Sequence, residues 1–252
     1  MTQLLRIGIA GIGGRMGGET AVNAETDPRV TLVGGLIRPG TRPPEWEGLL
    51  ISDDADHLLP HIDCLIDLSL PTATASLASA SARHGVALVC GVTGLEDGAI
   101  EALVDAGNAI PVLWSRNLSA GIPLIADLVR TLSAALSSYD IEIVETHHRG
   151  KRDAPSGTAM ILAEAAAEGR GRSIDELAVY GRSGVAPRTS GEIGIHALRA
   201  GALPGEHVIL VAGDDEEIRI SHRALSRRAF ATGAIESSLR LAAQPPGYRT
   251  SI

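Results

Sequence analysis

A glycine-rich turn near the start of the chain constrains the fold more than any other feature. A short apolar run, 4–10, precedes it, and a helical pattern follows it. Gly11, Gly14 and Gly17 give the spacing G-x-x-G-x-x-G, because Met16 occupies the last glycine position of the usual G-x-G-x-x-G fingerprint. Small residues let the backbone turn tightly, and a helix N-terminus offers free N–H groups to a pyrophosphate. Glycines also make ordinary turns, but this placement between a strand and a helix predicts a dinucleotide-binding cradle.

Strand-like runs alternate with helical patterns through the first half of the chain. Such alternation is typical of a parallel sheet with helices on both faces. The expected strands cover 4–10, 29–37, 63–70, 86–92 and 110–116, and the expected helices cover 71–85 and 95–107.

The second half of the chain has a different pattern. A long helical stretch, 121–138, precedes the segment 139–148, in which successive residues face opposite sides of a strand. Further extended runs with short turns predict an antiparallel or mixed open sheet, which forms a separate layer. These runs cover 192–201, 206–213 and 216–224, and a final helical pattern covers 227–244.

Composition limits the class of protein. The chain has 252 residues, of which 44% are hydrophobic, so two domains with aliphatic cores are expected. An aromatic content of 2% and a net charge of -8 argue against nucleic-acid and membrane partners. Cys64 and Cys90 lie in apolar runs and are expected to be buried. No apolar run reaches about 18 residues, and we expect a soluble cytoplasmic protein.

Residues at the ends of the expected strands are candidates to contact the dinucleotide, because loops at the carboxyl ends of parallel strands line the ligand crevice. Ile37 and Arg38 stand where many NAD-binding folds have an acid for the ribose hydroxyls. An arginine suits a 2′-phosphate better than a bare ribose, although a solvated arginine is the simpler alternative. Gly91, Thr93 and Asn117 are expected to border the nicotinamide, or to be plain turn residues.

The segment 145–159, ETHHRGKRDAPSGTA, carries the densest set of functional side chains. His147 and His148 are neighbours and face opposite ways in an extended segment, so they are not expected to share a metal ion. A P-loop is not expected either, because Arg152 stands where that motif needs Ser or Thr. The stretch APSGTA lacks the G-x-S-x-G elbow of serine hydrolases. The remaining interpretation of this segment is a site that binds an anion and transfers a proton.

A helix N-terminus explains this segment best. Pro155 suits the first turn of a helix, and Ser156, Gly157 and Thr158 would then offer hydroxyl and N–H groups to a carboxylate or phosphate. His147 or Lys151 could supply a proton. The simpler alternative is a surface loop with a capped helix. Positive charge is added by His148, Arg149, Lys151 and Arg152.

Four segments together resemble the 4-hydroxy-tetrahydrodipicolinate reductase (dihydrodipicolinate reductase) family of lysine and diaminopimelate biosynthesis. They are IAGIGGRMG, ETHHRGKRDAPSGTA, RAGALPGEH and SRRAFATGA, and the resemblance covers nearly the whole chain. The second segment matches the family signature E-x-H-H-x-x-K-x-D-A-P-S-G-T-A at every specified position.

The resemblance implies an α/β protein that forms a homotetramer. Residues 1–118 would be a Rossmann-like dinucleotide-binding domain. Residues 119–226 would be an α+β substrate-binding and oligomerisation domain with an open mixed sheet, and 227–252 a helix returning to the first domain. The activity implied is hydride transfer from NADPH or NADH to 4-hydroxy-tetrahydrodipicolinate, a small dicarboxylate, with proton donation and loss of water.

The resemblance also implies roles for individual residues. No metal site is expected, because the two histidines face opposite ways and no cysteine is near them. His147 and Lys151 correspond to the acid/base residues. The substrate carboxylates would be held by His148, Lys151, Ser156, Gly157 and Thr158. The cofactor would be lined by Gly11, Ile12, Gly13, Gly14, Arg15, Met16, Arg38, Gly91, Val92, Thr93, Ser115, Arg116, Asn117, Leu118, Arg227 and Phe230.

Two departures from the family pattern concern the cofactor. Ile37 replaces an acid, so Arg38 with Arg15 is expected to favour NADPH over NADH. Leu118 replaces an aromatic residue, so a ring contact with the nicotinamide is lost. Two alternative functions are a dinucleotide sensor without turnover and a reductase of a different small dicarboxylate. The predicted carboxylate-binding residues argue against the sensor, because a protein that only senses a dinucleotide does not need to bind carboxylates.

Overall fold

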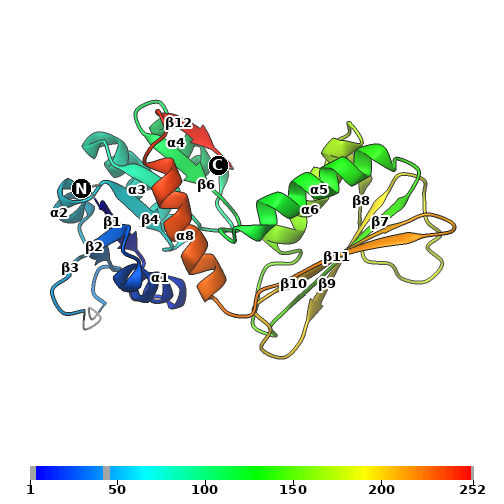
Figure 1. The fold of residues 1–252 in the computed structure, drawn as a ribbon, viewed down its shortest axis with the longest axis horizontal. Coiled ribbons are helices and arrows are strands. Elements are labelled where there is room, and N and C mark those ends of the chain that lie inside the picture. The colour runs from blue at the N-terminus through cyan, green and yellow to red at the C-terminus, as the bar shows by residue number, and fades with distance from the viewer. Residues whose placement is uncertain (1–3, 42–45, 251–252) are drawn as a thin grey trace. The chain divides into compact units, whose positions relative to one another are not determined.

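The computed structural model describes residues 4–41 and 46–250, and the chain divides into two compact units. The N-terminal unit combines Met1–Ser119 with Arg227–Ile252, and the C-terminal unit is Ala120–Ser226. Figure 1 shows each unit as a sheet with its helices.

Among the described residues, the N-terminal unit contains a seven-stranded parallel sheet. Its strands are β1 (Leu5–Ala10), β2 (Val30–Leu36), β3 (Leu50–Ser52), β4 (Cys64–Asp67), β5 (Ala87–Cys90), β6 (Pro111–Trp114) and β12 (Gly247–Arg249). The strand order is β12-β6-β5-β4-β1-β2-β3, so the order reverses beside β1, as in Rossmann folds. The predicted fold class of this half is confirmed.

Helices cover both faces of this sheet. On one face lie α1 (Arg15–Thr26) and α8 (Arg228–Leu241), and on the other lie α2 (Ala55–Leu58), the 3₁₀ turn η1 (Leu59–His61), α3 (Pro71–His84) and α4 (Asp97–Ala106). Helices α1 and α8 pack side by side although they come from opposite ends of the sequence (Figure 1).

Alternate side chains of the central strands fill two separate cores. Cys64 lies in the core beneath α1 and α8, whereas Cys90 lies in the core beneath α3 and α4. Both are free, buried thiols, as predicted, and burial raises the pKa of Cys64 to about 12. They fill space as small apolar residues.

The C-terminal unit, described throughout, is built on a five-stranded mixed sheet. Its strands are β7 (Asp140–His147), β8 (Ala178–Tyr180), β9 (Ile193–Arg199), β10 (Glu206–Ala212) and β11 (Glu217–Arg223), and its helices are α5 (Gly121–Ala135), α6 (Gly157–Gly169) and α7 (Ile174–Leu177). In the order β11-β10-β7-β9-β8, β10 is antiparallel to both neighbours and β9 is parallel to both of its own. The predicted mixed sheet is confirmed.

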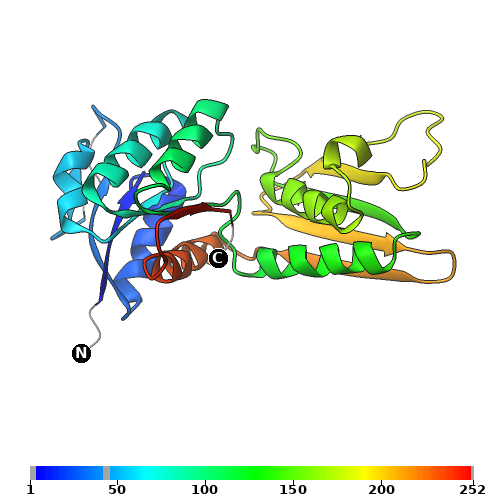
Figure 2. The same cartoon turned by 90° about the horizontal axis from the view of Figure 1, so that it is seen from above.

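Helices α5 and α6 pack together over one face of this sheet (Figure 2). Ile141 and Ile143 of β7 point into this covered face and are fully buried, together with Ile209 of β10. The opposite face carries half-buried side chains such as Val144 and Val208. One face of the sheet is therefore covered and the other is open.

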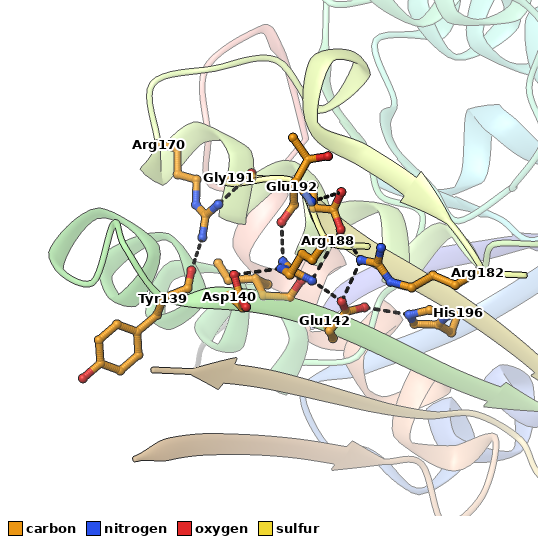
Figure 3. Close-up of polar contacts among 11 residues, drawn as sticks. Tyr139, Asp140, Glu142, Arg170, Arg182, Arg188, Gly191, Glu192 and His196 are labelled. Carbon is orange, nitrogen blue, oxygen red and sulfur yellow. Dashed lines mark hydrogen bonds and ion pairs between the residues drawn. The ribbon is translucent and has the colours of Figure 1, made fainter. Parts of the chain in front are cut away.

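A long segment without regular structure, 181–192, is tied to the sheet by charged side chains (Figure 3). Glu142, on the open face of β7, pairs with Arg188 and lies 3.1 Å from Arg182 Nη2 and 2.6 Å from His196 Nε2. Arg182 also pairs with Glu192. The pairs with Glu142 fix both Arg182 and Arg188 of the segment against β7.

Candidate active site

The glycine turn after β1 is held against two neighbouring segments. Gly11 has a φ of +78°, and a Cβ there would lie 2.7 Å from the carbonyl oxygen of Leu68. A Cβ on Gly17 would collide with the Gly11 carbonyl and lie 2.8 Å from Ile12 Cα. Gly14, the N-cap of α1, makes no side-chain cap, and the first turn of the helix contains no acid. The glycines thus bring strand, loop and helix close together and leave the helix start suited to an anion.

The residues of this turn divide into an exposed tip and a buried base. Gly13, Gly14 and Arg15 are exposed, and Met16 is half-buried. The Ile12 side chain is fully buried in the core, so this residue can offer a ligand only its backbone.

Loops after three adjacent strands meet at the same edge of the sheet. A Cβ on Gly91, after β5, would lie 2.7 Å from Leu118 Cδ1 and 3.0 Å from Leu68 Cδ2. Thr93 is exposed at this edge, whereas the side chains of Val92 and Leu118 belong to the two cores. The absence of a side chain at Gly91 permits the side chains of Leu68 and Leu118 to come this close to its backbone.

The loop after β6 is organised by its own polar groups. The Ser115 hydroxyl donates to the Asn117 carbonyl at 2.7 Å, and the Ser119 N–H donates to Asn117 Oδ1 at 2.7 Å. Arg116 between them is half-buried. The Asn117 side chain therefore shapes its own loop.

The remaining predicted cofactor residues lie at the ends of β2 and α8. Arg38 follows β2 and is exposed, and the preceding Ile37 N–H donates to the Ser52 carbonyl of β3 at 2.9 Å. Arg227, the N-cap of α8, is exposed, and Phe230 in its first turn is half-buried. All predicted cofactor residues thus belong to the N-terminal unit.

The signature segment of the C-terminal unit runs from β7 into α6. Glu145 and His147 are on the covered face of β7, with exposed fractions of 0% and 8%. His148 follows the strand and is half-buried, and its N–H donates to the Leu203 carbonyl at 2.8 Å. The expected alternation of side chains holds along β7 up to its last residue, His147, which lies on the face covered by the helices.

Helix α6 begins later than the sequence predicts. Ser156 is its N-cap, and its hydroxyl oxygen accepts the Ala159 N–H at 3.1 Å. Pro155 therefore precedes the helix, and its predicted place in the first turn is wrong. The serine cap is a stronger start signal than the proline, because it satisfies a free N–H of the helix. Gly157 and Thr158 become the first two helical residues, half-buried and buried respectively.

Glu145 is the centre of the polar network. Arg199 of β9 binds its carboxylate with both Nη atoms, at 2.8 and 2.9 Å. His147 Nδ1 lies 2.5 Å from Oε2, and the Ser156 N–H donates to Oε1 at 3.0 Å. Burial alone would raise the pKa of Glu145, but the hydrogen bonds from Arg199 and His147 hold that pKa below its ordinary value. Glu145 is therefore a buried, ionised carboxylate.

His207 of β10 extends this network. Its Nε2 lies 3.0 Å from Ser156 Oγ, and its ring meets that of His147 edge-on, with centroids 5.3 Å apart. The Ser156 hydroxyl is occupied by His207 and the helix cap, and its N–H by Glu145, so Ser156 holds the start of α6 in place. Burial lowers the pKa of His207 to about 3, which keeps this ring neutral near pH 7.

The buried His207 is expected to make the protein acid-labile. Its pKa is lower in the folded state than the unfolded value of about 6.5, so the unfolded state binds a proton first as pH falls. Stability should decrease from about pH 6.5 towards pH 3, by up to about 1.4 kcal/mol per pH unit. Urea denaturation across this range measures the slope. His207→Asn should flatten it, and an unchanged slope would contradict this role.

Lys151 is the only lysine in the sequence, which otherwise uses arginine as its cation. Its Nζ lies 2.8 Å from both carboxylate oxygens of Asp153, and its side chain is 18% exposed. Burial lowers the pKa of His147 most, and the positive charge of Lys151 lowers it further. The ammonium group of Lys151 therefore acts on the His147 ring. An ammonium can release a proton near neutral pH when perturbed, whereas a guanidinium cannot.

Sequence reasoning missed three members of the network: Glu145, Arg199 and His207. The sequence did contain a signal for Glu145. Strand alternation places it on the same buried face as Ile143, where a carboxylate without a partner would be costly. Its partners come from other strands. The register sets His147 beside Arg199 on β9, and Glu145 beside His207 on β10. Only the strand pairing brings these residues together.

In residues 4–41 and 46–250, no three His, Cys, Asp or Glu side chains are arranged to hold a metal ion. No helix in the same ranges has the length and apolar character needed to cross a membrane.

The arrangement can bind an anion and move a proton. The start of α6, where the helix dipole favours negative charge, lies next to a buried histidine, its carboxylate and an ammonium group. In the N-terminal unit, the exposed glycine turn and converging loops form the edge at which Rossmann folds bind dinucleotides.

The chain is similar to known proteins over nearly its whole length. The 4-hydroxy-tetrahydrodipicolinate reductase of Rubrobacter xylanophilus is 44% identical over 97% of this chain and 95% of the relative, and that of Thermomicrobium roseum is 42% identical over 97% and 96%. The solved structure of a dipicolinate-bound dihydrodipicolinate reductase from Paenisporosarcina sp. TG-14 has the same fold, with a TM-score of 0.79 at 22% identity over 98% of each chain. Family profiles described as the N-terminus and C-terminus of dihydrodipicolinate reductase match residues 5–118 and 121–251. The chain belongs to the dihydrodipicolinate reductase family, whose curated members carry the name 4-hydroxy-tetrahydrodipicolinate reductase.

Proposed function

We propose that the protein reduces 4-hydroxy-tetrahydrodipicolinate to tetrahydrodipicolinate with NADPH or NADH, in lysine and diaminopimelate biosynthesis. The relatives that carry this name cover nearly the whole chain. The observation that carries the proposal is the buried Glu145–His147 pair beside Lys151 and the start of α6. The reaction takes up a hydride and a proton and releases water, so it needs a proton-handling group beside a seat for carboxylates.

The glycine turn fits a dinucleotide. The exposed Gly13 and Gly14 leave room for a pyrophosphate, and the start of α1 has neither a side-chain cap nor an acid that would compete with it. We assign the predicted cofactor residues to this role, with Ile12, Val92 and Leu118 contributing through backbone or packing. When bound, the nicotinamide supplies the hydride, and residues of this chain hold the reactants and move the proton.

The substrate carboxylates are assigned to the start of α6. Gly157 and Thr158 are the first two helical residues, where the helix dipole favours an anion, and the Ser156 cap positions them. His148 and Lys151 add charge-assisted contacts. His147 and Lys151 are the residues that exchange a proton, with His147 buried and its pKa lowered chiefly by that burial.

We assign 1–118 to the dinucleotide, 119–226 to substrate binding and oligomerisation, and 227–252 to a helix returning to the first domain. A homotetramer assembled through the open face of the C-terminal sheet is supported by the apolar Val144 and Val208 on that face. Light scattering should give four times the chain mass. A cytoplasmic location suits the small soluble reactants of this reaction.

One coupled assay tests the function. A synthase makes the substrate from pyruvate and aspartate semialdehyde, and nicotinamide absorbance reports oxidation of NADPH or NADH. We expect turnover with both cofactors. A folded protein that binds NADPH but oxidises neither cofactor would refute the reductase and favour a sensor.

NADPH is the expected preferred cofactor. No acid stands at position 37 to hold two ribose hydroxyls, and Arg38 and Arg15 are exposed beside the cradle. A charge-assisted contact of about 1.5–3 kcal/mol corresponds to roughly a tenfold to hundredfold preference. Arg38→Ala should weaken NADPH binding by that factor and leave NADH binding almost unchanged. Arg83→Ala, which removes an exposed arginine paired with Asp56, is the control. Equal dissociation constants for both cofactors at low salt would contradict this preference.

Thr158→Val tests the carboxylate seat. The substitution deletes one hydroxyl while nearly keeping shape at a buried position. Loss of a charge-assisted hydrogen bond, about 1.5–3 kcal/mol, should raise the Michaelis constant for the substrate with little change in kcat. Thr146→Val, at a half-buried position on the opposite face of β7, is the matched control. An unchanged Michaelis constant with a lower melting temperature would instead assign Thr158 to helix capping.

A further inference from the structure

The contact between Glu145 and His147 has a defined direction. Because Arg199 binds both oxygens of the Glu145 carboxylate, this carboxylate is ionised and can only accept hydrogen bonds. His147 Nδ1, 2.5 Å from Oε2, must then carry the hydrogen. The other nitrogen, Nε2, is left as the one that can take up or release a proton.

The Nε2 edge of the ring lies against Gly205, just before β10. A Cβ at this position would approach Nε2 to 2.8 Å. A glycine here therefore keeps the backbone close to the ring without a side chain on the proton-exchanging nitrogen. The ring is fixed at Nδ1 by Glu145, and no side chain of residue 205 covers Nε2.

Charged and titratable groups reach His147 from every element packed around it. Glu145 lies on its own strand, Arg199 on β9 and Lys151 on the loop towards α6, where it is paired with Asp153. His207 lies on β10, and His222 on β11 stands behind it, with ring centroids 6.5 Å apart.

We propose that Glu145 and Arg199 are positioning residues for His147. Glu145 holds the ring as the Nδ1–H tautomer, so that Nε2 exchanges the proton in the reaction. Arg199 binds both oxygens of the Glu145 carboxylate, and its positive charge offsets part of the negative charge at the ring. The inference deepens the proposed function, because it rests on His147 acting in proton transfer there.

Electrostatics gives the two residues opposite effects on the ring. Burial lowers the pKa of His147, and the Glu145 hydrogen bond and charge oppose that effect. The charges of Lys151 and Arg199 add to the lowering. Removing the charge of Glu145 should thus move the titration of His147 down, and removing that of Arg199 should move it up.

The same strand supplies a matched control. Glu142 also pairs with arginines and with a histidine, His196, but lies on the opposite face of β7. Glu142→Gln therefore removes the same kind of ion-paired carboxylate without touching His147. It should leave the tautomer and the titration midpoint of His147 unchanged.

Nitrogen-15 NMR of histidine-labelled full-length protein tests the proposal without substrate. His147 is assigned by the signal lost in His147→Asn. In the wild type, Nδ1 should show the shift of a protonated nitrogen and Nε2 that of an unprotonated one. Glu145→Gln should lower the titration midpoint, and Arg199→Met should raise it. The proposal is overturned by a proton on Nε2 in the wild type, or by midpoints that move in the same direction.

A double variant guards against misfolding. Glu145→Leu with Arg199→Met removes both charges and the acceptor together, which avoids a buried unpaired charge. With no acceptor beside Nδ1, the ring should lose its fixed tautomer. A ring that stays Nδ1-protonated in this variant would overturn the proposal.

Steady-state kinetics separates this inference from the proposed function. Glu145→Gln should lower kcat by on the order of tenfold to a hundredfold, less than the full contribution of proton transfer, with little change in the Michaelis constants. Its kcat–pH profile should shift in the same direction as the NMR midpoint. A wild-type protein without reductase activity would refute the function, whereas the substrate-free NMR result would still decide what Glu145 does to His147.

Discussion

Lys151→Ala is expected to lower kcat by on the order of a hundredfold or more, the usual cost of losing a group that transfers a proton. The side chain is the only lysine in the sequence and is mostly shielded from solvent, with Asp153 as its partner. The Michaelis constant for the substrate should also rise, because a charge that neutralises a carboxylate is lost. The dissociation constant for NADPH should hardly change, because the predicted cofactor residues belong to the other unit. Coupled turnover and cofactor titration measure both effects.

Lys151→Arg separates the two roles of this side chain. A guanidinium keeps the positive charge but remains protonated, so it should restore the Michaelis constant and leave kcat low. Arg152→Ala removes the neighbouring exposed cation and should have a small effect on both constants. Near-normal turnover of Lys151→Ala would remove this residue from the mechanism.

Arg199→Met is expected to destabilise the C-terminal unit by roughly 3–5 kcal/mol, because it leaves the fully buried Glu145 carboxylate without its main partner. Thermal and urea denaturation followed by circular dichroism measure the loss. Arg219→Met breaks an exposed ion pair with Glu217 on β11 and should leave stability almost unchanged, because solvent screens that pair.

The pH dependence of this loss has a definite sign. In the wild type the pKa of Glu145 is below its unfolded value of about 4.3, so its contribution is present above that pH and disappears as pH falls through the folded pKa. The difference between wild type and Arg199→Met should therefore be largest near neutral pH and should shrink on acidification. A difference that does not vary with pH would mean that lost packing, not charge, is the cause.

Local sequence patterns predicted most of the architecture. The run of alternating strands and helices in the first half indicated a parallel sheet, and the structure has one, with the glycine turn directly after β1. The alternation in 139–148 indicated a strand with two unlike faces, and β7 has them. These features depend on residues close together in the chain, where periodicity carries the information.

The polar network could not be predicted in the same way. Arg199 and His207 reach Glu145 through the register of β9 and β10 on β7, and register is a property of strand pairing over long sequence separations. The predicted start of α6 was wrong for a local reason. The prediction relied on Pro155, whereas the helix begins after the Ser156 N-cap. The roles assigned to the individual cofactor and substrate residues stay predictions.

The chain order of the two units has a consequence for biosynthesis. The C-terminal unit is one continuous stretch, Ala120–Ser226, whereas the N-terminal unit needs α8 and β12, which are translated after that stretch. Ala234, Ile235 and Leu241 of α8 complete the core beneath α1. A nascent chain that lacks these residues exposes an apolar face of the N-terminal sheet. The C-terminal unit can therefore finish folding before the N-terminal unit does. This order is the reverse of the usual one, in which the N-terminal domain folds first.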